Sequence, residues 1–447
     1  MRTKNVREVA LETLLAVEEK EAYSNLLLNN MIQTYRLPKK DVGLLTEIVY
    51  GTIQRRDTLD YYLRPFIKKA RKLQTWVKVL LRLSLYQMIY LDRIPDRAAI
   101  FEAVEIAKKR GHQGIASMVN GVLRAIQREG VPSLDTIVDD IERLAVATSH
   151  PYWLVKRWVN QYGIEETKKM CETNLHAPKQ TARVNTVRTT VEQVIHTLEQ
   201  EGVEVARGEI VEEAIQAKKG NLAHTQVFQK GLITIQDESS MLVARALGVH
   251  EHEQVLDSCA APGGKSTHIA ELMNNTGRVV SLDIHEHKVK LIEEQAKRLQ
   301  LTNIVTHVLD SRRVADYFAE ETFDKILVDA PCSGFGVVRR KPDIKYAKTE
   351  ADIPALATLQ FEILRAVAPL LKKGGTLVYS TCTVDEEENG AVIRQFLQQH
   401  PEFILDETLK ERLPKKVQPY VHDGQLHLLP HYFGSDGFFI ASLRKKV

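Results

Sequence analysis

Two cysteines in this sequence have surroundings that favour covalent chemistry. Cys332 lies in an Asp-Ala-Pro-Cys segment at the end of one apolar run, and Cys382 lies in a Ser-Thr-Cys-Thr segment at the end of another. The thiolate is the reactive form of cysteine and a strong nucleophile. A single free cysteine is more often a small buried hydrophobic residue. Two cysteines at the carboxyl ends of neighbouring strands, close to helix N-termini, favour a nucleophilic role instead.

A loop of small residues lies between an apolar run and an apolar helical pattern. Residues 257–265 read Asp-Ser-Cys-Ala-Ala-Pro-Gly-Gly-Lys. In open α/β sheets such a loop, beyond the end of a strand, is a ligand site. The Gly-Lys-Ser at 264–266 resembles the end of a P-loop, but the first glycine of a P-loop falls at Cys259, and a G-x-G-x-x-G fingerprint is absent. The loop therefore predicts a ligand with little phosphate.

Acidic residues end three further apolar runs. Asp283 falls 19 residues after Gly264, the spacing at which a carboxylate receives ribose hydroxyls. Asp310 ends the next apolar run and is placed to accept a hydrogen bond from an adenine amino group. Asp329 ends the apolar run that follows. An Asp after a strand is also a common helix cap. Three strand-terminal acids in register favour the ligand, which we expect to carry adenosine.

These residues require a parallel sheet to bring them together. Apolar runs that end in acids or cysteines alternate with helical patterns from about residue 241 onward, which predicts a doubly wound α/β sheet. Strands are expected at 254–256, 279–283, 304–310, 326–329 and 377–383, and helices at 269–273, 289–299 and 353–371.

The first 130 residues differ from the rest in pattern and in charge. Their apolar residues recur at helical spacing, for example Ile115, Met118, Val119, Val122 and Ile126. They carry a net charge of +9, whereas residues 131–447 carry −6. This asymmetry is consistent with a nucleic-acid partner and equally with solvated helix faces. Residues 152–235 mix helix with short β-like runs and predict a small α+β unit.

Composition and cysteine content limit the class of protein and the cell compartment that we expect. The chain has 44% apolar and 27% charged residues, no apolar leader at its N-terminus and no run that approaches a membrane span. The four cysteines lack metal spacing and are too few for a disulfide framework, so we expect free thiols, no metal and no membrane partner. A cytoplasmic monomer is the expectation.

Four motifs in order identify a family that the chain resembles. They are residues 257–265, Asp-Ala-Pro-Cys-Ser-Gly at 329–334, Ser-Thr-Cys-Thr at 380–383 and Asp-Gly-Phe-Phe at 436–439. Together they resemble S-adenosylmethionine-dependent RNA cytosine-C5 methyltransferases. The front of the chain resembles the NusB-like RNA-binding domain, on residues 6–28, 84–97 and 98–125. Residues 183–185 and 236–240 match the small RRM-like lobe of these enzymes. The whole chain is similar to the RsmB (Sun/Fmu) family.

The resemblance implies three domains and one activity. The domains are an all-α NusB-like domain at 1–140, an α+β RRM-like lobe at 146–240, and a Rossmann-like catalytic domain at 241–447. The activity is transfer of a methyl group from S-adenosyl-L-methionine to carbon 5 of a 16S ribosomal RNA cytosine, cytosine 967, through a covalent cysteine adduct at carbon 6. Small-subunit ribosomal RNA is the implied partner.

The resemblance also implies roles for single residues. Cys382 is the nucleophile, Cys332 assists product release, Asp329 holds the cytosine edge, and Lys265 faces the base. The cofactor contacts are Cys259, Ala260, Ala261, Pro262, Gly263, Gly264, Lys265, Asp283, Asp310 and Asp329. Apart from the resemblance, the residues do not decide which thiol attacks, and Lys265 also reads as an ordinary helix-start lysine.

Two charged segments complete the predicted site region. The cations Arg339, Arg340 and Lys341 follow Cys332 closely and are predicted to bind RNA phosphates. A cytosine inside a duplex would have to unstack to meet the thiol. Residues 385–389 are predicted to open a helix, where their acids offset the helix dipole without a catalytic role.

Other functions stay open from the residues alone. They are a cytosine-C5 methyltransferase of transfer RNA or 23S ribosomal RNA, a P-loop ATPase, and a non-catalytic NusB-like RNA-binding assembly factor.

Overall fold

The computed structural model describes residues 5–20, 24–67 and 73–447, and the chain divides into two compact units. The first unit contains Met1–His176 and Val338–Lys348, and the second contains Ala177–Val337 and Thr349–Val447. The segment Val338–Lys348 thus interrupts the sequence of the second unit but belongs to the first. The domain limits predicted from the sequence stay a prediction.

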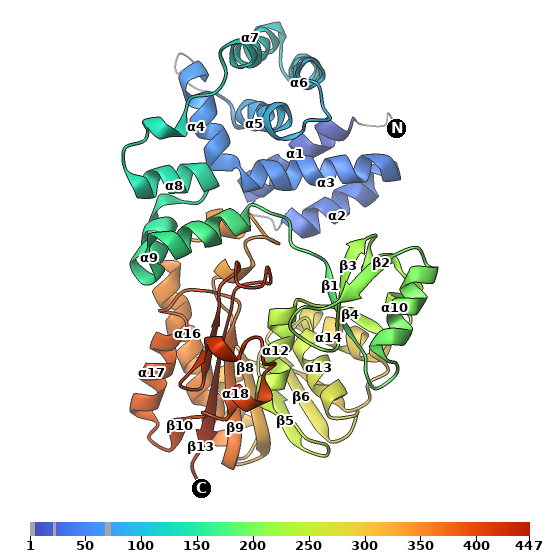
Figure 1. The fold of residues 1–447 in the computed structure, drawn as a ribbon, viewed down its shortest axis with the longest axis vertical. Helices are drawn as coiled ribbons and strands as arrows, with labels where there is room; N and C mark the ends of the chain where they lie inside the picture. The colour runs from blue at the N-terminus through green and yellow to red at the C-terminus, as the bar shows by residue number, and fades with distance from the viewer. Residues whose placement is uncertain (1–4, 21–23, 68–72) are drawn as a thin grey trace. The chain divides into compact units, whose positions relative to one another are not determined.

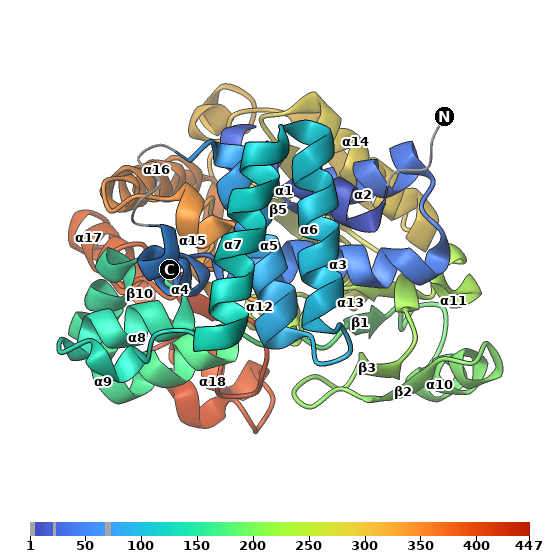
Figure 2. The same ribbon diagram turned by 90° about the horizontal axis from the view of Figure 1, so that it is seen from above.

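The first unit is helical, as expected, and Figure 2 shows α5, α6 and α7 running side by side within it. Its helices are α1 (Val6–Lys20), α2 (Ser24–Tyr35), α3 (Lys39–Gln54), α4 (Arg56–Ile67), α5 (Thr75–Tyr90), α6 (Asp96–Arg110), α7 (Gln113–Glu129), the 3-10 helix η1 (Leu134–Thr136), α8 (Asp140–Thr148), α9 (Tyr152–Asn174) and α15 (Ile344–Ala347).

The helical periodicity of the sequence explains this bundle. The buried residues of α7, which include Val119, Val122 and Ile126, lie on one face and join a core formed by α1, α3, α5 and α6. Helix α6 ends at Arg110, directly before Gly111, with three cations in its last turn. The predicted apolar stripes of the sequence are thus the core of the unit.

The second unit begins with a small antiparallel sheet in the order β2-β3-β1-β4. Its elements are β1 (Thr181–Val184), α10 (Val191–Gln200), β2 (Glu204–Arg207), β3 (Ala214–Lys219), η2 (Leu222–His224), α11 (Gln226–Gln229) and β4 (Ile233–Ile235). The apolar face of α10 packs on β1 and β3. Strand β3 begins with three buried residues and ends with the exposed lysines Lys218 and Lys219.

The larger sheet has nine strands among the described residues, in the order β11-β12-β13-β9-β8-β5-β6-β7, with β10 paired to β13. Its strands are β5 (Gln254–Asp257), β6 (Arg278–Asp283), β7 (Ile304–Val308), β8 (Phe323–Asp329), β9 (Leu371–Thr381), β10 (Phe403–Leu405), β11 (Val421–His422), β12 (Gln425–Leu428) and β13 (Phe438–Lys445). The pairs β7-β6, β6-β5, β5-β8 and β8-β9 are parallel, and β13 joins β9 antiparallel. The predicted doubly wound parallel core is confirmed.

Helices cover both faces of this sheet, as Figure 1 shows in yellow and orange. They are α12 (Glu238–Leu247), α13 (Gly264–Leu272), α14 (Glu286–Leu299), η3 (Ser311–Asp316), η4 (Phe335–Val337), α16 (Asp352–Val367), η5 (Ala368–Leu370), α17 (Gly390–Gln399), α18 (Leu409–Arg412) and η6 (Gln418–Tyr420). Successive strand residues alternate between two cores. Val255 and Leu327 face α12 and α13, whereas Leu256 and Val328 face α16 and α17.

One helix corrects an expectation from the sequence. Among the described residues, Asp352–Leu370 is long and apolar enough by length and composition to cross a membrane, although no such segment was expected. Part of its length is buried, and α16 packs on η3, α17 and β8. Its apolar face is that of a helix that covers a parallel sheet. No group of three or more His, Cys, Asp or Glu side chains suited to a metal ion occurs in residues 5–20, 24–67 and 73–447.

Candidate active site

The predicted site residues of the second unit lie at the carboxyl ends of its parallel strands. The strand order reverses at β5, because β6 and β7 lie on one side of it and β8 and β9 on the other. Ligands of doubly wound sheets bind at such a switch point. The loops that follow β5 through β9 therefore form the rim of the candidate site.

The loop after β5 is held close to the sheet and to a helix. Gly263 has a φ of 101°, and a Cβ atom there would lie 3.1 Å from the Cα of Ile292, so a side chain would meet both strain and contact. The N–H of Ala260 donates to the carbonyl of Leu282 at 2.8 Å. Helix α13 begins directly after the loop, at Gly264, and its first amides point toward the site. The geometry suits a ligand that approaches the backbone closely.

Asp257, beneath this loop, is a residue that the sequence analysis gave no role. Its Oδ2 accepts from Ser266 Oγ at 2.6 Å, and its Oδ1 has no hydrogen-bond partner among the described residues. Burial raises the pKa of this carboxyl to about 7, opposed by the Ser266 hydrogen bond. A buried carboxylate oxygen without a partner fits a ligand with an ammonium group. S-Adenosylmethionine carries such a group.

The two acids predicted to hold adenosine differ in their environment. Asp283 is half-buried at the end of β6, and its Oδ1 accepts the N–H of His285 at 2.9 Å. Asp310, after β7, is bound by Arg312, whose Nη2 lies 2.7 Å from Oδ2. That hydrogen bond lowers the pKa of Asp310, so the carboxylate is ionised and an acceptor. The proposed ribose and adenine contacts are compatible with these environments and stay predictions.

Cys259, predicted as a cofactor contact, is not a reactive thiol. Burial raises its pKa to about 12, and the charge of Asp257 adds to this effect. The side chain is a neutral part of the loop, on the core side of the sheet. A backbone contact is the form of binding open to it.

Asp329 forms the polar link between the loop and the thiols. Its Oδ2 lies 2.7 Å from Lys265 Nζ, and its Oδ1 accepts from Ser380 Oγ at 2.8 Å. Burial opposes the charge of Lys265, but the attraction of Asp329 outweighs it and the pKa of Lys265 is raised. The ammonium is therefore committed to Asp329 and to the face of Phe438, 5.1 Å away.

The structure brings the two cysteines together. Cys332 Sγ lies 3.4 Å from Cys382 Sγ, because β8 and β9 are adjacent parallel strands with Asp329 opposite Ser380. The hydrogen bond to Cys382 and burial raise the pKa of Cys332 well above its usual value. The charge of Cys382 also raises the pKa of Lys265, and the same attraction favours a Cys382 thiolate. Either sulfur can donate the hydrogen bond, and the raised pKa of Cys332 favours its protonated form.

Sequence reasoning missed the residues that hold these loops. Residues 385–389 do not open a helix as predicted, because α17 starts at Gly390, and Glu388 and Asn389 in this segment are buried. Glu388 binds the Cys332 loop through Ser333, and Asn389 binds the Cys382 loop. A run of four acids and an Asn resembles a solvated helix start, so only the tertiary structure reveals its burial.

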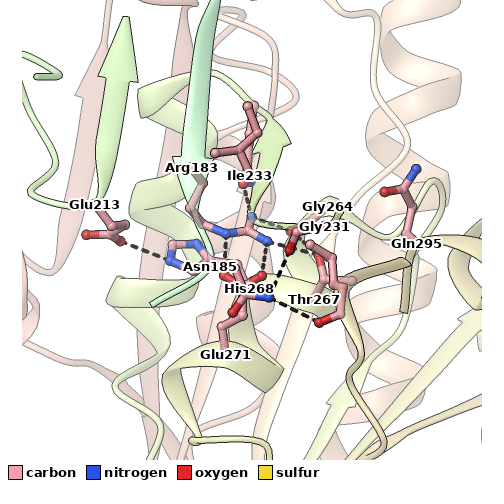
Figure 3. A network of polar contacts seen from close by, with 12 residues as sticks. Arg183, Asn185, Glu213, Gly231, Ile233, Gly264, Thr267, His268, Glu271 and Gln295 are labelled. Carbon is pink, nitrogen blue, oxygen red and sulfur yellow. Dashed lines mark hydrogen bonds and ion pairs between the residues drawn. The ribbon is translucent and has the colours of Figure 1, made fainter. Parts of the chain in front are cut away.

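Arg183, in β1, is a second residue to which the sequence analysis gave no role. Figure 3 shows its guanidinium between the small sheet and α13. Nη1 donates to the carbonyl of Gly264 at 2.9 Å and also to Gln236, and Nη2 donates to Thr267 at 3.1 Å. Nε and Nη2 bind the carboxylate of Glu271. The small sheet thereby fixes the first turn of the helix that follows the ligand loop.

A neighbouring network in Figure 3 ties the same elements together. His268, also on α13, has its Nε2 3.0 Å from Glu213 Oε1, and Glu213 also binds Arg245 of α12. Burial of Glu213 is outweighed by these partners, so its pKa is lowered. Asn185 Nδ2 donates to the carbonyl of Leu299 at 3.1 Å.

The predicted RNA-binding cations belong to the first unit. Arg339, Arg340 and Lys341 belong to the segment that joins the helical unit, where Arg339 Nε donates to the carbonyl of His176 at 3.3 Å. Lys341 is exposed, and the two arginines are half-buried. Their contact with RNA phosphates stays a prediction.

Comparison with known proteins agrees with this geometry. Residues 244–444 match the family model for 16S rRNA methyltransferase RsmB/F, residues 4–128 match the NusB family, and residues 150–222 match the RsmF/B-like ferredoxin-like domain. The chain is 59% identical over 446 residues to a probable ribosomal RNA small subunit methyltransferase B of Bacillus subtilis, which covers 100% of both chains.

Solved structures share the same architecture. The crystal structure of PH0851 is 28% identical with a TM-score of 0.82, and covers 100% of this chain and 99% of that chain. NSun6 from Pyrococcus horikoshii with SFG shares the fold at 24% identity and a TM-score of 0.58, covering 65% of this chain and 97% of that chain. From these matches and the site geometry, the chain belongs to the ribosomal RNA small subunit methyltransferase B (RsmB) family of S-adenosylmethionine-dependent RNA methyltransferases.

Proposed function

We propose that this protein methylates carbon 5 of cytosine 967 in 16S ribosomal RNA through a covalent adduct with Cys382. The observation that carries the proposal is the 3.4 Å separation of the Cys332 and Cys382 sulfurs beside the ligand loop. A single thiol is enough to bind a ligand or to pack a core. Two thiols in contact at the switch point support a nucleophile and a partner that exchange a proton.

The chemistry follows from the weak nucleophilicity of cytosine carbon 5. S-Adenosylmethionine supplies an electrophilic methyl group. The Cys382 thiolate adds to carbon 6, which makes carbon 5 nucleophilic enough to accept that methyl. A base then removes the proton from carbon 5, and the bond between carbon 6 and sulfur breaks to restore the thiolate and the aromatic ring.

Each remaining side chain has a task in this sequence. The Cys382 thiolate is favoured by the nearby Lys265 ammonium, and its neutral neighbour Cys332 donates a hydrogen bond to it. Asp329 is positioned by Lys265 and Ser380 to hold the polar edge of the cytosine while charge develops on the ring. Cys332 acts in release of the product from the enzyme.

Three residues of the cofactor loop and two acids support binding of S-adenosylmethionine. Gly263 and Gly264 permit close approach of the backbone, and the orphaned Asp257 oxygen suits the ammonium of the cofactor. Asp283 and Asp310 are proposed to hold the ribose and adenine. The whole remaining loop, Cys259, Ala260, Ala261 and Pro262, contributes backbone contacts.

Substrate delivery completes the proposal. The helical unit and the cations at 339–341 bind the RNA backbone, which supplies most of the affinity. The target cytosine is unpaired or flipped out, so that thiolate and methyl approach its ring from opposite faces. We place this activity in the cytoplasm and expect the protein to act as a monomer.

The test is transfer of labelled methyl from S-adenosylmethionine to deproteinised 16S ribosomal RNA. We expect label with the wild type and with Cys171→Ala, a control cysteine buried in the helical unit, and none with Cys382→Ala. Cys332→Ala should accumulate a protein–RNA adduct that resists SDS. A transcript with uridine in place of cytosine 967 should take no label.

Other outcomes would replace parts of the proposal. Label in 23S ribosomal RNA or transfer RNA, with none in 16S RNA, would overturn the substrate. An adduct that persists in Cys382→Ala and vanishes in Cys332→Ala would exchange the roles of the thiols. Equal labelling of the uridine transcript would overturn the target nucleotide.

A further inference from the structure

Glu388 is a fully buried carboxylate that the proposed mechanism leaves unused. It lies between β9 and α17, and its oxygens serve the Cys332 loop. Oε1 accepts the N–H of Ser333 at 2.8 Å and Nε2 of Gln360 at 3.0 Å, and Oε2 contacts the Ser333 hydroxyl. The backbone carbonyl of Glu388 also accepts from Tyr379 Oη at 2.6 Å. Charged side chains are buried in this way only when they are fully hydrogen-bonded.

The next residue binds the other cysteine loop. Asn389 Nδ2 donates to the carbonyl of Thr383 at 3.0 Å, and its Oδ1 accepts from Thr381. Ser333 Oγ and Thr383 Oγ1 are 2.9 Å apart and close the link between the loops. Two consecutive side chains therefore hold the residues on either side of the sulfur pair.

We propose that Glu388 is a positioning residue for the two thiols: its carboxylate fixes the Cys332 loop against the Cys382 loop and presents negative charge to Cys332. The proposal rests on the two-thiol mechanism above. The distance between the two sulfurs does not by itself distinguish the roles of the two cysteines. The charge of Glu388 supplies a physical reason for that distinction.

The charge argument follows from competition between the thiols. Two sulfurs 3.4 Å apart cannot both ionise without strong repulsion, so one proton is shared unequally. Negative charge beside Cys332 makes its ionisation less favourable, and the thiolate then forms on Cys382. The pKa of Cys332 is raised by its hydrogen bond to Cys382, by burial, and then by the charges of Cys382, Glu388 and Asp329.

Other ionisable groups face this cluster from the adjoining elements. Burial raises the pKa of Glu388 itself, and the hydrogen bonds from Ser333 and Gln360 oppose that effect. Lys265 faces Cys382 and Asp329 from α13, so its cation favours the Cys382 thiolate. The other ionisable neighbours are Asp385 and Tyr379.

The decisive variant is Glu388→Gln. The glutamine Oε1 can accept from Ser333 and Gln360 as before, while its amide N–H can donate to the Ser333 hydroxyl. The variant thus keeps the hydrogen bonds and removes only the charge. Glu386→Gln is the matched control, because it removes the same charge from the same segment at a carboxylate that pairs with Arg394 near the surface.

The measurement is the rate of alkylation of each cysteine by iodoacetamide as a function of pH, without RNA or S-adenosylmethionine. Mass spectrometry of the peptides resolves Cys332 from Cys382. In Glu388→Gln we expect the profile of Cys332 to move to lower pH, with several-fold faster alkylation at pH 8, and that of Cys382 to move to higher pH. Glu386→Gln should leave both profiles unchanged.

Glu388→Asp separates charge from position. It keeps the carboxylate but is shorter by one methylene, so we expect a profile for Cys332 close to that of the wild type and a several-fold lower kcat with unchanged KM for S-adenosylmethionine. Thermal unfolding of both variants checks the fold.

Two results would overturn the proposal. Wild-type alkylation profiles in a folded Glu388→Gln protein would show that the charge is irrelevant to the thiols. A wild-type kcat in Glu388→Asp would show that the positions of the two cysteine loops do not depend on the exact placement of this carboxylate. Because the alkylation assay needs no RNA, failure of the proposed substrate or target leaves its result interpretable.

Discussion

Arg183 and Glu271 form an ion pair with almost no exposed surface, with Nε 2.8 Å from Oε2 and side chains 0% and 2% exposed. The arginine comes from the small antiparallel sheet and the glutamate from the helix that follows the ligand loop. The small sheet is thereby bonded to the part of the core that we propose binds the cofactor. Buried pairs of this kind contribute more to positioning than to stability.

The first prediction concerns this pair. Arg183→Met leaves Glu271 buried without its partner and should lower the free energy of unfolding by about 3–5 kcal/mol. Arg183→Met combined with Glu271→Leu should recover most of that loss. Both variants lack the guanidinium that binds the Gly264 carbonyl and keep only the longer bond to it from Thr267 Oγ1, at 3.2 Å. The dissociation constant for S-adenosylmethionine should therefore rise about five-fold in the double variant.

Denaturant unfolding and calorimetric titration with S-adenosylmethionine check these two results. Arg188→Met serves as a control, since that half-buried side chain donates to backbone carbonyls of the small sheet region, at Lys230 and Gly231. A double variant that is stable and binds the cofactor as tightly as the wild type would show that Arg183 does not position the loop.

The second prediction concerns Lys265 and the charge on Cys382. Lys265→Met removes the cation that favours the thiolate, so alkylation of Cys382 by iodoacetamide should require higher pH. Lys265→Arg keeps a cation and should stay close to the wild-type profile. An unchanged profile in Lys265→Met would show that the ammonium acts on Asp329 alone.

The third prediction concerns oxidation of the sulfur pair. Hydrogen peroxide should convert the two thiols into a disulfide with release of water, because a sulfenic acid on one sulfur has the other thiol within reach. Activity should fall and return with dithiothreitol. Intact-mass and peptide analysis should locate the loss of two hydrogens at Cys332 and Cys382, with Cys171 and Cys259 still reduced. Overoxidation to sulfonic acid without a disulfide would contradict this expectation.

The fourth prediction concerns Lys345, which is fully buried in the helical unit. Its Nζ donates to the carbonyl of Gln54 at 3.0 Å, and burial lowers its pKa to about 7, against the attraction of Asp57. The unfolded chain has an ordinary lysine pKa of about 10.4. Between these two values the unfolded state binds more protons, so this group makes the protein more stable as pH rises.

Lys345→Met tests the predicted direction in which stability changes with pH. The variant lacks the penalty of a buried ammonium, so its advantage in unfolding temperature over the wild type should be largest near pH 7 and shrink toward pH 10. Arg55, Arg56, His150, Cys171 and Tyr346 also face this lysine. Lys341→Met, at an exposed lysine of the same segment, should show no such pH dependence. A constant difference across this range would contradict the linkage.

The parallel core could be predicted from the sequence because its strands are continuous apolar runs that end in chemically distinctive residues. Asp283, Asp329, Cys332 and Cys382 follow strands whose order obeys general rules for doubly wound sheets, so their meeting at one edge follows from topology. The contact between the two sulfurs needed only one further condition, that β8 and β9 are neighbours.

The supporting residues could not be predicted, for reasons that are physical. Glu388 and Arg183 are charged, and charged side chains are usually exposed unless they are paired. Their partners are distant in sequence: Glu271 lies 88 residues from Arg183, and Ser333 lies 55 residues from Glu388. No local pattern contains such a pairing. The burial of Lys345 could not be predicted for the same reason, since it depends on helices far upstream in the sequence.

The segment Val338–Lys348 has a consequence for how the protein is made. It supplies the buried Lys345 to the helical unit, yet it is synthesised after both halves of the small sheet and most of the parallel strands. Residue 348 of 447 must leave the ribosome before the first unit is complete. The first unit therefore receives its last segment only after most of the second unit has been translated.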